Sequence, residues 1–198
     1  MRPQDRARDR QIRRRVARAL SYGRCAGATK YVKPNVANSM EPTNDELERL
    51  HPATFGWALV CCRFDRQEAE DVVQTVYLKL LDGRARFDGR SSYKTWLFAV
   101  VRRTAADRRR RTLVATLGLA RLFERTPAPS SAASVEPDDR ARVRAALTAL
   151  SARQREVLDL VFYHELTIEE AARVMGVSLG AARVHYDRGK KNLREKLG

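Results

Sequence analysis

The stretch TIEEAARVMGVSLGAARVHYDRGKKNL, residues 167–193, has the pattern of two helices joined by a three-residue turn. Thr167 and Glu170 form a capping-box pair that starts the first helix, and Gly176 can adopt the left-handed conformation that ends it. Ser178 then starts the second helix as its cap. Small and apolar residues four, three and four positions apart make one buried stripe on that helix: Ala182, Tyr186, Gly189 and Leu193. This order of elements predicts a helix-turn-helix motif.

The second helix of this motif is basic outside its buried stripe. A helix-turn-helix presents the first turn of its second helix to base edges in the major groove and its cationic flank to phosphates. Arg183 can reach guanine, and Leu179 or Val184 can meet a thymine methyl group. The alternative is that this face is only solvated. The residues expected to read duplex DNA are Ser178, Leu179, Gly180, Arg183, Val184 and Arg188.

Two apparent catalytic motifs fail on their context. Residues 176–180, GVSLG, match the GxSxG of serine hydrolases, but that motif requires a strand before the serine, and a capped helix precedes Ser178. His164 and Glu165 do not extend to HExxH, because Ile168 occupies the second ligand position. We find no glycine-rich phosphate or dinucleotide motif and no paired metal-ligand spacing. The sequence therefore predicts no enzyme activity, no cofactor and no metal.

The composition favours a folded protein with a polyanionic partner. Among 198 residues, 39 are Lys or Arg and 24 are Asp or Glu, which gives a net charge of +15, and 43% are hydrophobic. Such a surplus of positive charge suits nucleic acid or an anionic membrane surface. Apolar stretches such as Trp57 to Cys62 stop at an Arg, so neither a membrane span nor a secretory signal is expected. Cys25, Cys61 and Cys62 lack CxxC spacing and are interpreted as reduced thiols of a cytoplasmic protein.

The chain is expected to be all-α, because helix signals follow one another from residue 41 onward without a convincing alternating strand. Residues 1–39 hold eleven basic and two acidic residues and are expected to be disordered, either as an inert tail or as a nonspecific tether for nucleic acid. Pro, Ser and Ala dominate the end of a linker before the last domain. The predicted parts are the extension 1–39, a helical domain at 40–111, the linker 112–137 and a second helical domain at 138–198.

The first domain is expected to begin with a capping-box pair, Thr43 and Glu46. A helix restarts after Pro52 and runs to about Arg63. The next begins with Asp65 as its cap, and its apolar stripe comprises Ala69, Val72, Val73, Val76, Tyr77, Leu80 and Leu81. Ser91 or Ser92 caps the third, which ends in an arginine run at 108–111. The apolar patch at 113–123 is either a short helix over its own domain or a docking segment.

Five motifs in order resemble the small, extracytoplasmic-function (ECF) type of bacterial sigma-70 initiation factors. They are EAEDVVQTVY at 68–77, FDGR at 87–90 with Trp96-Leu97, LSARQREVL at 150–158, TIEEAA at 167–172 and KKNLR at 190–194. The likeness covers residues 53–111 and 138–197. It implies an RNA polymerase subunit with two promoter readers, one for the −35 duplex and one that opens and captures the −10 strand. An anti-sigma factor is a further partner that the likeness leaves open.

The resemblance also implies roles for particular residues. Those expected to bind core RNA polymerase are Glu70, Asp71, Gln74 and Leu78, although an exposed polar helix face can also be merely solvated. Opening a duplex leaves unstacked bases that need aromatic faces and a cationic track. The residues expected to supply these at the −10 element are Tyr93, Trp96, Arg102, Arg103, Arg108, Arg109 and Arg110, with Trp96 alternatively a core residue.

Three positions depart from the family pattern. Arg103 stands where the family commonly has Asn, Ala181-Ala182 where it often has Thr-Val, and Gly189 where it usually has Ala. The first two bear on promoter specificity, and the glycine is expected to loosen the last helical turns at a cost of about 1 kcal/mol. The alternative function is a free-standing helix-turn-helix regulator that binds its operator without polymerase.

Overall fold

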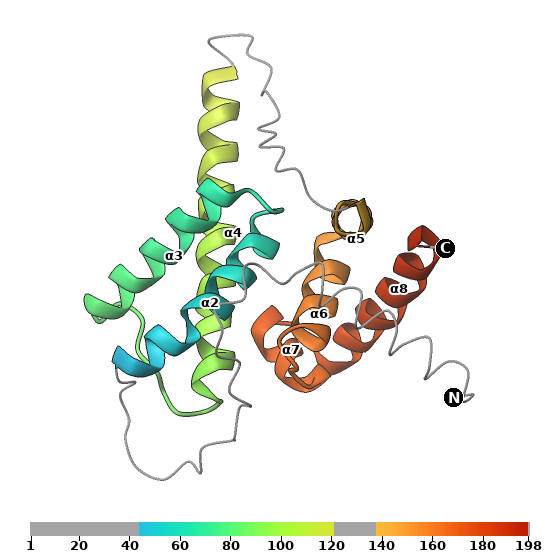
Figure 1. The fold of residues 1–198 in the computed structure, drawn as a ribbon. Helices are drawn as coiled ribbons and strands as arrows, with labels where there is room; N and C mark the ends of the chain where they lie inside the picture. The colour runs from blue at the N-terminus through green and yellow to red at the C-terminus, as the bar shows by residue number, and fades with distance from the viewer. Residues whose placement is uncertain (1–43, 121–137, 198) are drawn as a thin grey trace.

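The computed structural model describes residues 44–120 and 138–197 (Figure 1). Every regular element in these two ranges is a helix, which confirms the predicted all-α fold. The helices are α2 (Asn44–Cys61), α3 (Arg66–Leu81), α4 (Tyr93–Ala120), α5 (Asp138–Thr148), α6 (Ala152–Phe162), α7 (Ile168–Met175) and α8 (Leu179–Leu197). None of these helices is long and apolar enough to span a bilayer. The predictions for residues 1–39 and for most of the linker lie outside the described residues.

The predicted helix starts are confirmed by their hydrogen bonds. Asp65 accepts the backbone N–H of Glu68 at 3.0 Å, which satisfies one of the free donors at the start of α3. Thr167 and Glu170 form both bonds of the capping box. Gly176 ends α7 with φ +61°, in the left-handed region. Ser92 and Ser151 likewise accept backbone N–H groups in the first turns of α4 and α6.

Two of the predicted helix boundaries are wrong. Helix α2 runs through Pro52 without a restart, because the residues that follow it, Trp57 to Cys61, are buried and hold the helix against its neighbours. Helix α4 continues to Ala120, nine residues into the predicted linker. Residues 112–120 contain no proline, and their glycine, Gly118, costs about 1 kcal/mol of helix propensity relative to Ala without ending the helix.

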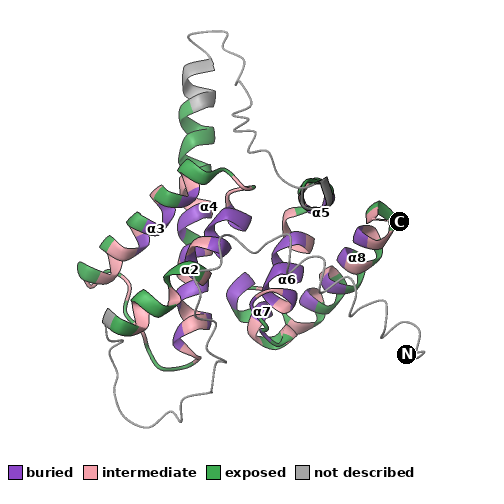
Figure 2. Cartoon of the chain, viewed as in Figure 1, coloured by how far each residue is buried: buried purple, intermediate pink, exposed green. Residues whose placement is uncertain are grey.

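The buried residues of α2–α4 and α5–α8 belong to one continuous cluster. Trp57 and Leu97 are fully buried in the first group, and Leu158 and Leu193 in the second. Helix α4 packs against α7, and α2 packs against α6. Figures 1 and 2 show this arrangement, in which purple, buried segments of α2 and α4 face α6 and α7. The two helical groups therefore form a closed body rather than two separate ones.

The predicted stripe of α3 is confirmed except at its last residue, since Tyr77 and Leu80 are half-buried and pack against the core. Ala69, Val72, Val73 and Val76 are buried, whereas Leu81 is 79% exposed. Cys61 is buried and Cys62 half-buried, and both are free thiols. Burial, with the charges of Glu68 and Asp65, raises the pKa of Cys62 to about 12. Cys25 lies outside the described residues.

Candidate nucleic-acid and protein interfaces

The turn before α8 presents the residues that were predicted to read duplex DNA. The buried stripe of this helix consists of the four predicted residues: Ala182, Tyr186, Gly189 and Leu193. The opposite face is open, since Ser178, Gly180, Arg183, Val184 and Arg188 are exposed and Leu179 is half-buried. Ser178 Oγ accepts the backbone N–H of Ala181 at 3.2 Å, so this hydroxyl caps the helix.

Contacts from α6 and α7 fix the position of α8. Arg153 Nη1 donates a hydrogen bond to the carbonyl oxygen of Met175 at 2.9 Å, which holds the end of α7 against α6. Asn192 Nδ2 donates to Gln154 Oε1 at 3.3 Å and joins α8 to α6. The face of α8 that was predicted to read DNA is thus held in place by contacts with α6 and α7.

Three aromatic rings meet at the start of α4. The centroids of Tyr93 and Trp96 are 5.5 Å apart with nearly parallel planes, and Phe87 packs edge-on against both. Tyr93 is only 7% exposed, and its burial raises the pKa of its hydroxyl. Trp96 is half-buried and keeps part of its surface free. Within this cluster Tyr93 supports Trp96, so Trp96 is better placed than Tyr93 to meet a base.

The predicted arginine track of α4 is only partly open. Arg103, Arg109 and Arg110 are exposed. Arg108 is half-buried and donates a hydrogen bond to Asp71 Oδ2 at 2.8 Å. Arg102 Nε donates to Glu156 Oε2 at 3.0 Å. The structure thus joins a residue predicted to bind DNA, Arg108, to one predicted to bind polymerase, Asp71.

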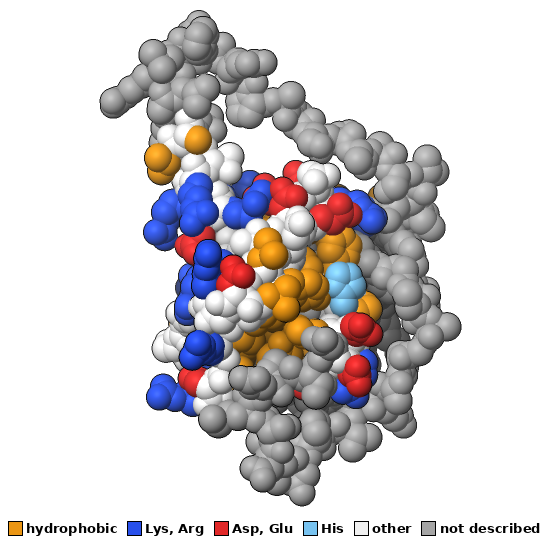
Figure 3. Space-filling view, turned by 90° about the vertical axis from the view of Figure 1, so that its left-hand side faces the viewer, with side chains coloured by type: hydrophobic (Ala, Val, Ile, Leu, Met, Phe, Trp, Pro, Cys, Tyr) orange, Lys and Arg blue, Asp and Glu red, His pale blue; other side chains and the backbone are white. Residues whose placement is uncertain are grey.

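Three of the four predicted polymerase-binding residues line a groove between α2 and α3. Its volume is about 440 Å³. Gln74 is exposed, Leu78 is 53% exposed and Glu70 bonds to Arg66 at 2.8 Å. The lining comprises His51, Phe55, Arg66, Glu70, Val73, Gln74, Tyr77, Leu78 and Leu81. Figure 3 shows hydrophobic side chains gathered on this side of the molecule with charged groups around them. Asp71 is not part of this lining.

Sequence reasoning missed the α2 side of the groove. His51 Nδ1 and Tyr77 Oη are 2.9 Å apart, a hydrogen bond that joins α2 to α3. Phe55 lies one turn further along α2. The periodicity of α3 left Leu78 outside the core, which was a signal for a binding surface. A pattern within one helix does not reveal which residues of another helix line the same groove.

Comparison with known proteins identifies both halves of the chain. The family described as "Sigma-70 region 2" matches residues 47–113, and "Sigma-70, region 4" matches residues 146–195. RNA polymerase sigma factor CarQ of Myxococcus xanthus is 30% identical over 130 residues, which are 66% of this chain and 75% of that protein. ECF RNA polymerase sigma factor SigC of Mycobacterium tuberculosis is 31% identical over 139 residues, 69% of this chain and 74% of that protein. The chain is an ECF sigma factor of the sigma-70 family.

A solved structure supports the same assignment. The sigma factor RpoE of Bartonella quintana, in complex with the anti-sigma factor NepR, superposes with a TM-score of 0.61 at 25% identity and covers 78% of this chain and 98% of its own. CnrH, in complex with the cytosolic domain of CnrY, gives a TM-score of 0.50 at 21% identity, which shows likeness of fold. We call α2–α4 of this sigma factor region 2 and α5–α8 region 4.

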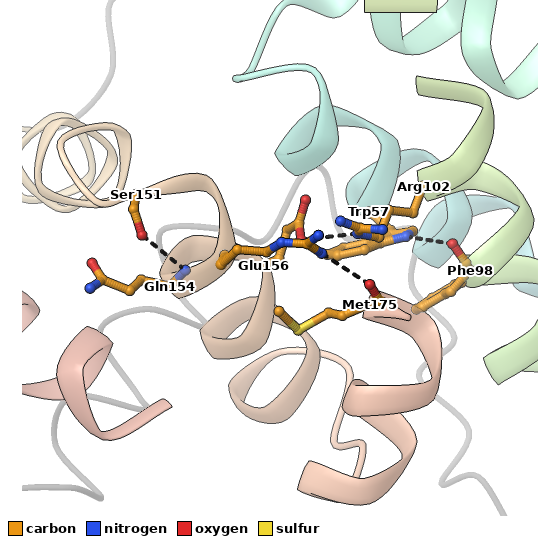
Figure 4. A network of polar contacts seen from close by, with 8 residues as sticks. Trp57, Phe98, Arg102, Ser151, Gln154, Glu156 and Met175 are labelled. Atoms are coloured by element: carbon orange, nitrogen blue, oxygen red, sulfur yellow. Dashed lines mark hydrogen bonds and ion pairs between the residues drawn. The ribbon is translucent and has the colours of Figure 1, made fainter. Parts of the chain in front are cut away.

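Polar contacts join region 2 of this sigma factor to region 4, and the sequence did not predict them (Figure 4). Glu156 of α6 binds Arg102 of α4, and Lys94 Nζ donates to the carbonyl oxygen of His164 at 2.8 Å. The His164 ring lies with its centroid 4.6 Å from Phe98 and 6.3 Å from Trp57. His164 had drawn notice only as part of a failed zinc motif.

Proposed function

We propose that this sigma factor binds core RNA polymerase through the α2–α3 groove, reads the −35 duplex with α8 and captures the −10 strand with α4. The proposal rests on one observation: the same chain has both a helix-turn-helix and an exposed groove lined by apolar and polar residues. A regulator that acts alone needs only the helix-turn-helix. In this proposal residues 40–111 and 138–198 are the two functional units, and the chain is a cytoplasmic initiation factor, not a catalyst.

The two readers act together in this proposal. Residues between α4 and α5 connect them, so binding at one promoter element raises the effective concentration of the other reader at its own element. Each contact can then be weak by itself. Because several phosphates are neutralised, promoter binding should fall steeply as salt concentration rises.

The role of α8 predicts that Arg183→Ala removes selectivity at the −35 element. One bidentate contact with guanine is worth about 1–3 kcal/mol of discrimination, and Arg183 is exposed at the position that would make it. Binding to core polymerase should not change. Arg142→Ala, which removes an exposed arginine from α5, is the matched control for the loss of charge. Selection from a random promoter pool measures the preference, and an unchanged −35 preference in the Arg183 variant would contradict this role.

The role of the groove predicts weaker polymerase binding when its exposed apolar edge is removed. Leu78→Ala combined with Gln74→Ala should lower affinity for core polymerase by about tenfold, the effect expected of an interface anchor. Gln67→Ala is the control, because Gln67 is also exposed on α3 but does not line the groove. Asp71 is left unchanged, since it holds Arg108. Fluorescence titration of labelled chain with core polymerase gives the affinities, and equal values for both variants would remove the groove from the interface.

The alternative regulator makes a different prediction for the whole chain. A sigma factor should co-elute with core polymerase in gel filtration and select DNA from a random pool only when core is present. Tight selective binding by the chain alone, with no association with core, would favour the regulator. The solved sigma factor RpoE was captured with the anti-sigma factor NepR, and this supports a protein of that kind as a further partner here.

A further inference from the structure

Arg108 joins α4 to two carboxylates of α3. Its Nη2 donates a hydrogen bond to Asp71 Oδ2 at 2.8 Å, and its Nε lies 3.8 Å from Glu68 Oε1. The side chains of these three residues are 35–36% exposed. A guanidinium binds a carboxylate in the way it binds a phosphate. Because two carboxylates already occupy Arg108, it has little left to offer a DNA phosphate.

A second polar bridge joins the same two helices one turn earlier along α4. Lys79 Nζ donates a hydrogen bond to Thr104 Oγ1 at 2.9 Å, and Thr104 is only 2% exposed. Residues four apart lie on the same face of a helix, so Thr104 and Arg108 both face α3. The two bridges therefore fix the rotation of α4 about its own axis.

Arg108 also marks the point where α4 becomes exposed. It is the last half-buried residue before a run, 109–115, in which every residue is exposed. Figure 2 shows this part of α4 in green beyond α3. The direction of the exposed run thus depends on how firmly the helix is held just before it. Arg108 supplies a bridge to α3 at that place.

The arginines that are open to solvent lie on a different side of α4. Seven residues make almost two helical turns, so Trp96, Arg103 and Arg110 follow one another along one line of the helix. Arg103 and Arg110 are exposed and Trp96 is half-buried. We call these three residues the open line of α4. Each residue turns the helix by about 100°, so Arg108 points to nearly the opposite side from Arg110.

We propose that Arg108 is a positioning residue and not a DNA contact: its bridge to Asp71 turns the open line of α4 toward the −10 strand. The open line supplies an aromatic face for an unstacked base and two cations for phosphates. Asp71 then serves α4 rather than polymerase. This inference rests on the proposed role of α4 in strand capture. It separates arginines that look equivalent in the sequence, because only a residue that neutralises a phosphate releases counterions on binding.

The test compares Arg108→Gln with Arg110→Gln, which remove the same charge from the same helix. Each variant is assembled with core polymerase in saturating excess, so that a change in affinity for core does not affect the result. The probe is the promoter that wild-type holoenzyme selects from the random pool, labelled with a fluorophore and with its −10 element left unpaired. Fluorescence anisotropy gives the dissociation constant between about 50 and 200 mM salt.

Both variants should bind the probe about threefold more weakly, the effect of a single partly exposed ion pair. Only Arg110→Gln should change the salt dependence. One lost phosphate contact lowers the slope of log K against log salt concentration by about 0.7 for a single strand. Arg108→Gln should keep the wild-type slope. It should also unfold at a lower urea concentration than Arg110→Gln, because Asp71 loses its partner.

Exchange of the two charges provides a rescue. Arg108→Asp combined with Asp71→Arg restores an ion pair between α4 and α3. The double variant should regain most of the wild-type affinity for the probe, although position 108 then carries a negative charge. If Arg108→Gln is not folded, Asp71→Asn decides. Asp71→Asn should weaken probe binding at an unchanged salt slope, even though it removes a negative charge from the DNA-binding domain.

Three results would overturn this role of Arg108. A slope lowered by about 0.7 in Arg108→Gln would make Arg108 a phosphate contact. An exchanged pair that binds no better than Arg108→Gln would show that the positive charge at position 108 matters and the bridge does not. Tighter binding with a steeper slope in Asp71→Asn would show that Asp71 only withholds Arg108 from the strand. Failure of the proposed function would instead appear with the wild-type chain, which would select no promoter in the presence of core.

Discussion

Gly189 illustrates how a single residue sets the distance between two helices. A Cβ atom at this position would lie 3.2 Å from Leu158 Cδ1 and 3.3 Å from Gln154 Cβ, closer than side chains normally approach. Leu158 is fully buried. The sequence indicated only that a glycine here weakens the last helix, because propensity is a property of one helix. The structure supplies the compensation, since the missing side chain lets α8 pack tightly on α6.

Gly189→Ala should therefore not give the stabilisation that helix propensity alone predicts. Alanine is favoured over glycine by roughly 0.5–1 kcal/mol inside a helix, but at position 189 this gain is offset by displacement of Leu158 and Gln154. Gly180→Ala is the control, because a Cβ there meets nothing within 4 Å. Urea unfolding should show a higher free energy of unfolding for Gly180→Ala only. Equal stabilisation by both substitutions would show that the close approach at Gly189 carries no penalty.

Helix starts and helix ends differed in how well the sequence predicted them. The starts of α3, α6 and α7 follow from Asp65, Ser151 and Thr167, because a cap bonds to groups only three residues away. The continuation of α2 through Pro52 depends on burial of the residues after it, which a local pattern does not report. In the same way, α4 extends to Ala120 although this stretch contains Gly118, a weak helix former. Helix starts, which depend on local hydrogen bonds, were therefore predictable from the sequence. Helix continuations that depend on tertiary packing were not.

At the level of the element, Thr167→Ala should destabilise region 4 by about 1–2 kcal/mol, because it removes the side chain at the centre of the capping box of α7. Thr167→Ser keeps the hydroxyl and should lose much less. Urea unfolding gives the free energies, and hydrogen exchange of the α7 amides locates the loss. If the alanine and serine variants were equally stable, the cap would contribute nothing to α7.

On the scale of the whole molecule, the contacts between the regions were beyond sequence reasoning. Arg102 and Glu156 are 54 residues apart, and Lys94 and His164 are 70 apart. Helical periodicity identifies the buried face of each helix. It does not show which other helix packs against that face. The exposed face of α8, which was predicted to read DNA, could be identified from the stripe and cap of that helix alone. The groove and the contacts between the regions could be identified only from three-dimensional positions.

His164→Ala tests how far the two regions unfold as one unit. The imidazole is 4% exposed and contacts Phe98 and Trp57 of region 2, so its removal should leave a cavity and cost roughly 2–4 kcal/mol. We expect one calorimetric transition for the wild type and two for this variant. His185→Ala is the control, because His185 is a half-buried residue of α8. A single transition in His164→Ala would mean that other contacts suffice to couple the regions.

The distance along the chain between Lys94 and His164 also sets an order of events during synthesis. A ribosome that adds about 5–20 residues per second needs roughly 4–14 s to make the 70 residues between them. For part of that interval, after Ala120 and before Ala152 is added, α4 is complete while α6 and α7 have not been made. Ribosome-stalled chains that end before Ser151 should therefore bind oligothymidine more tightly than the released full-length protein, and weaker binding would contradict this order. Each newly made chain thus passes once through a state in which α4, the helix proposed to capture the −10 strand, is not yet packed against α7.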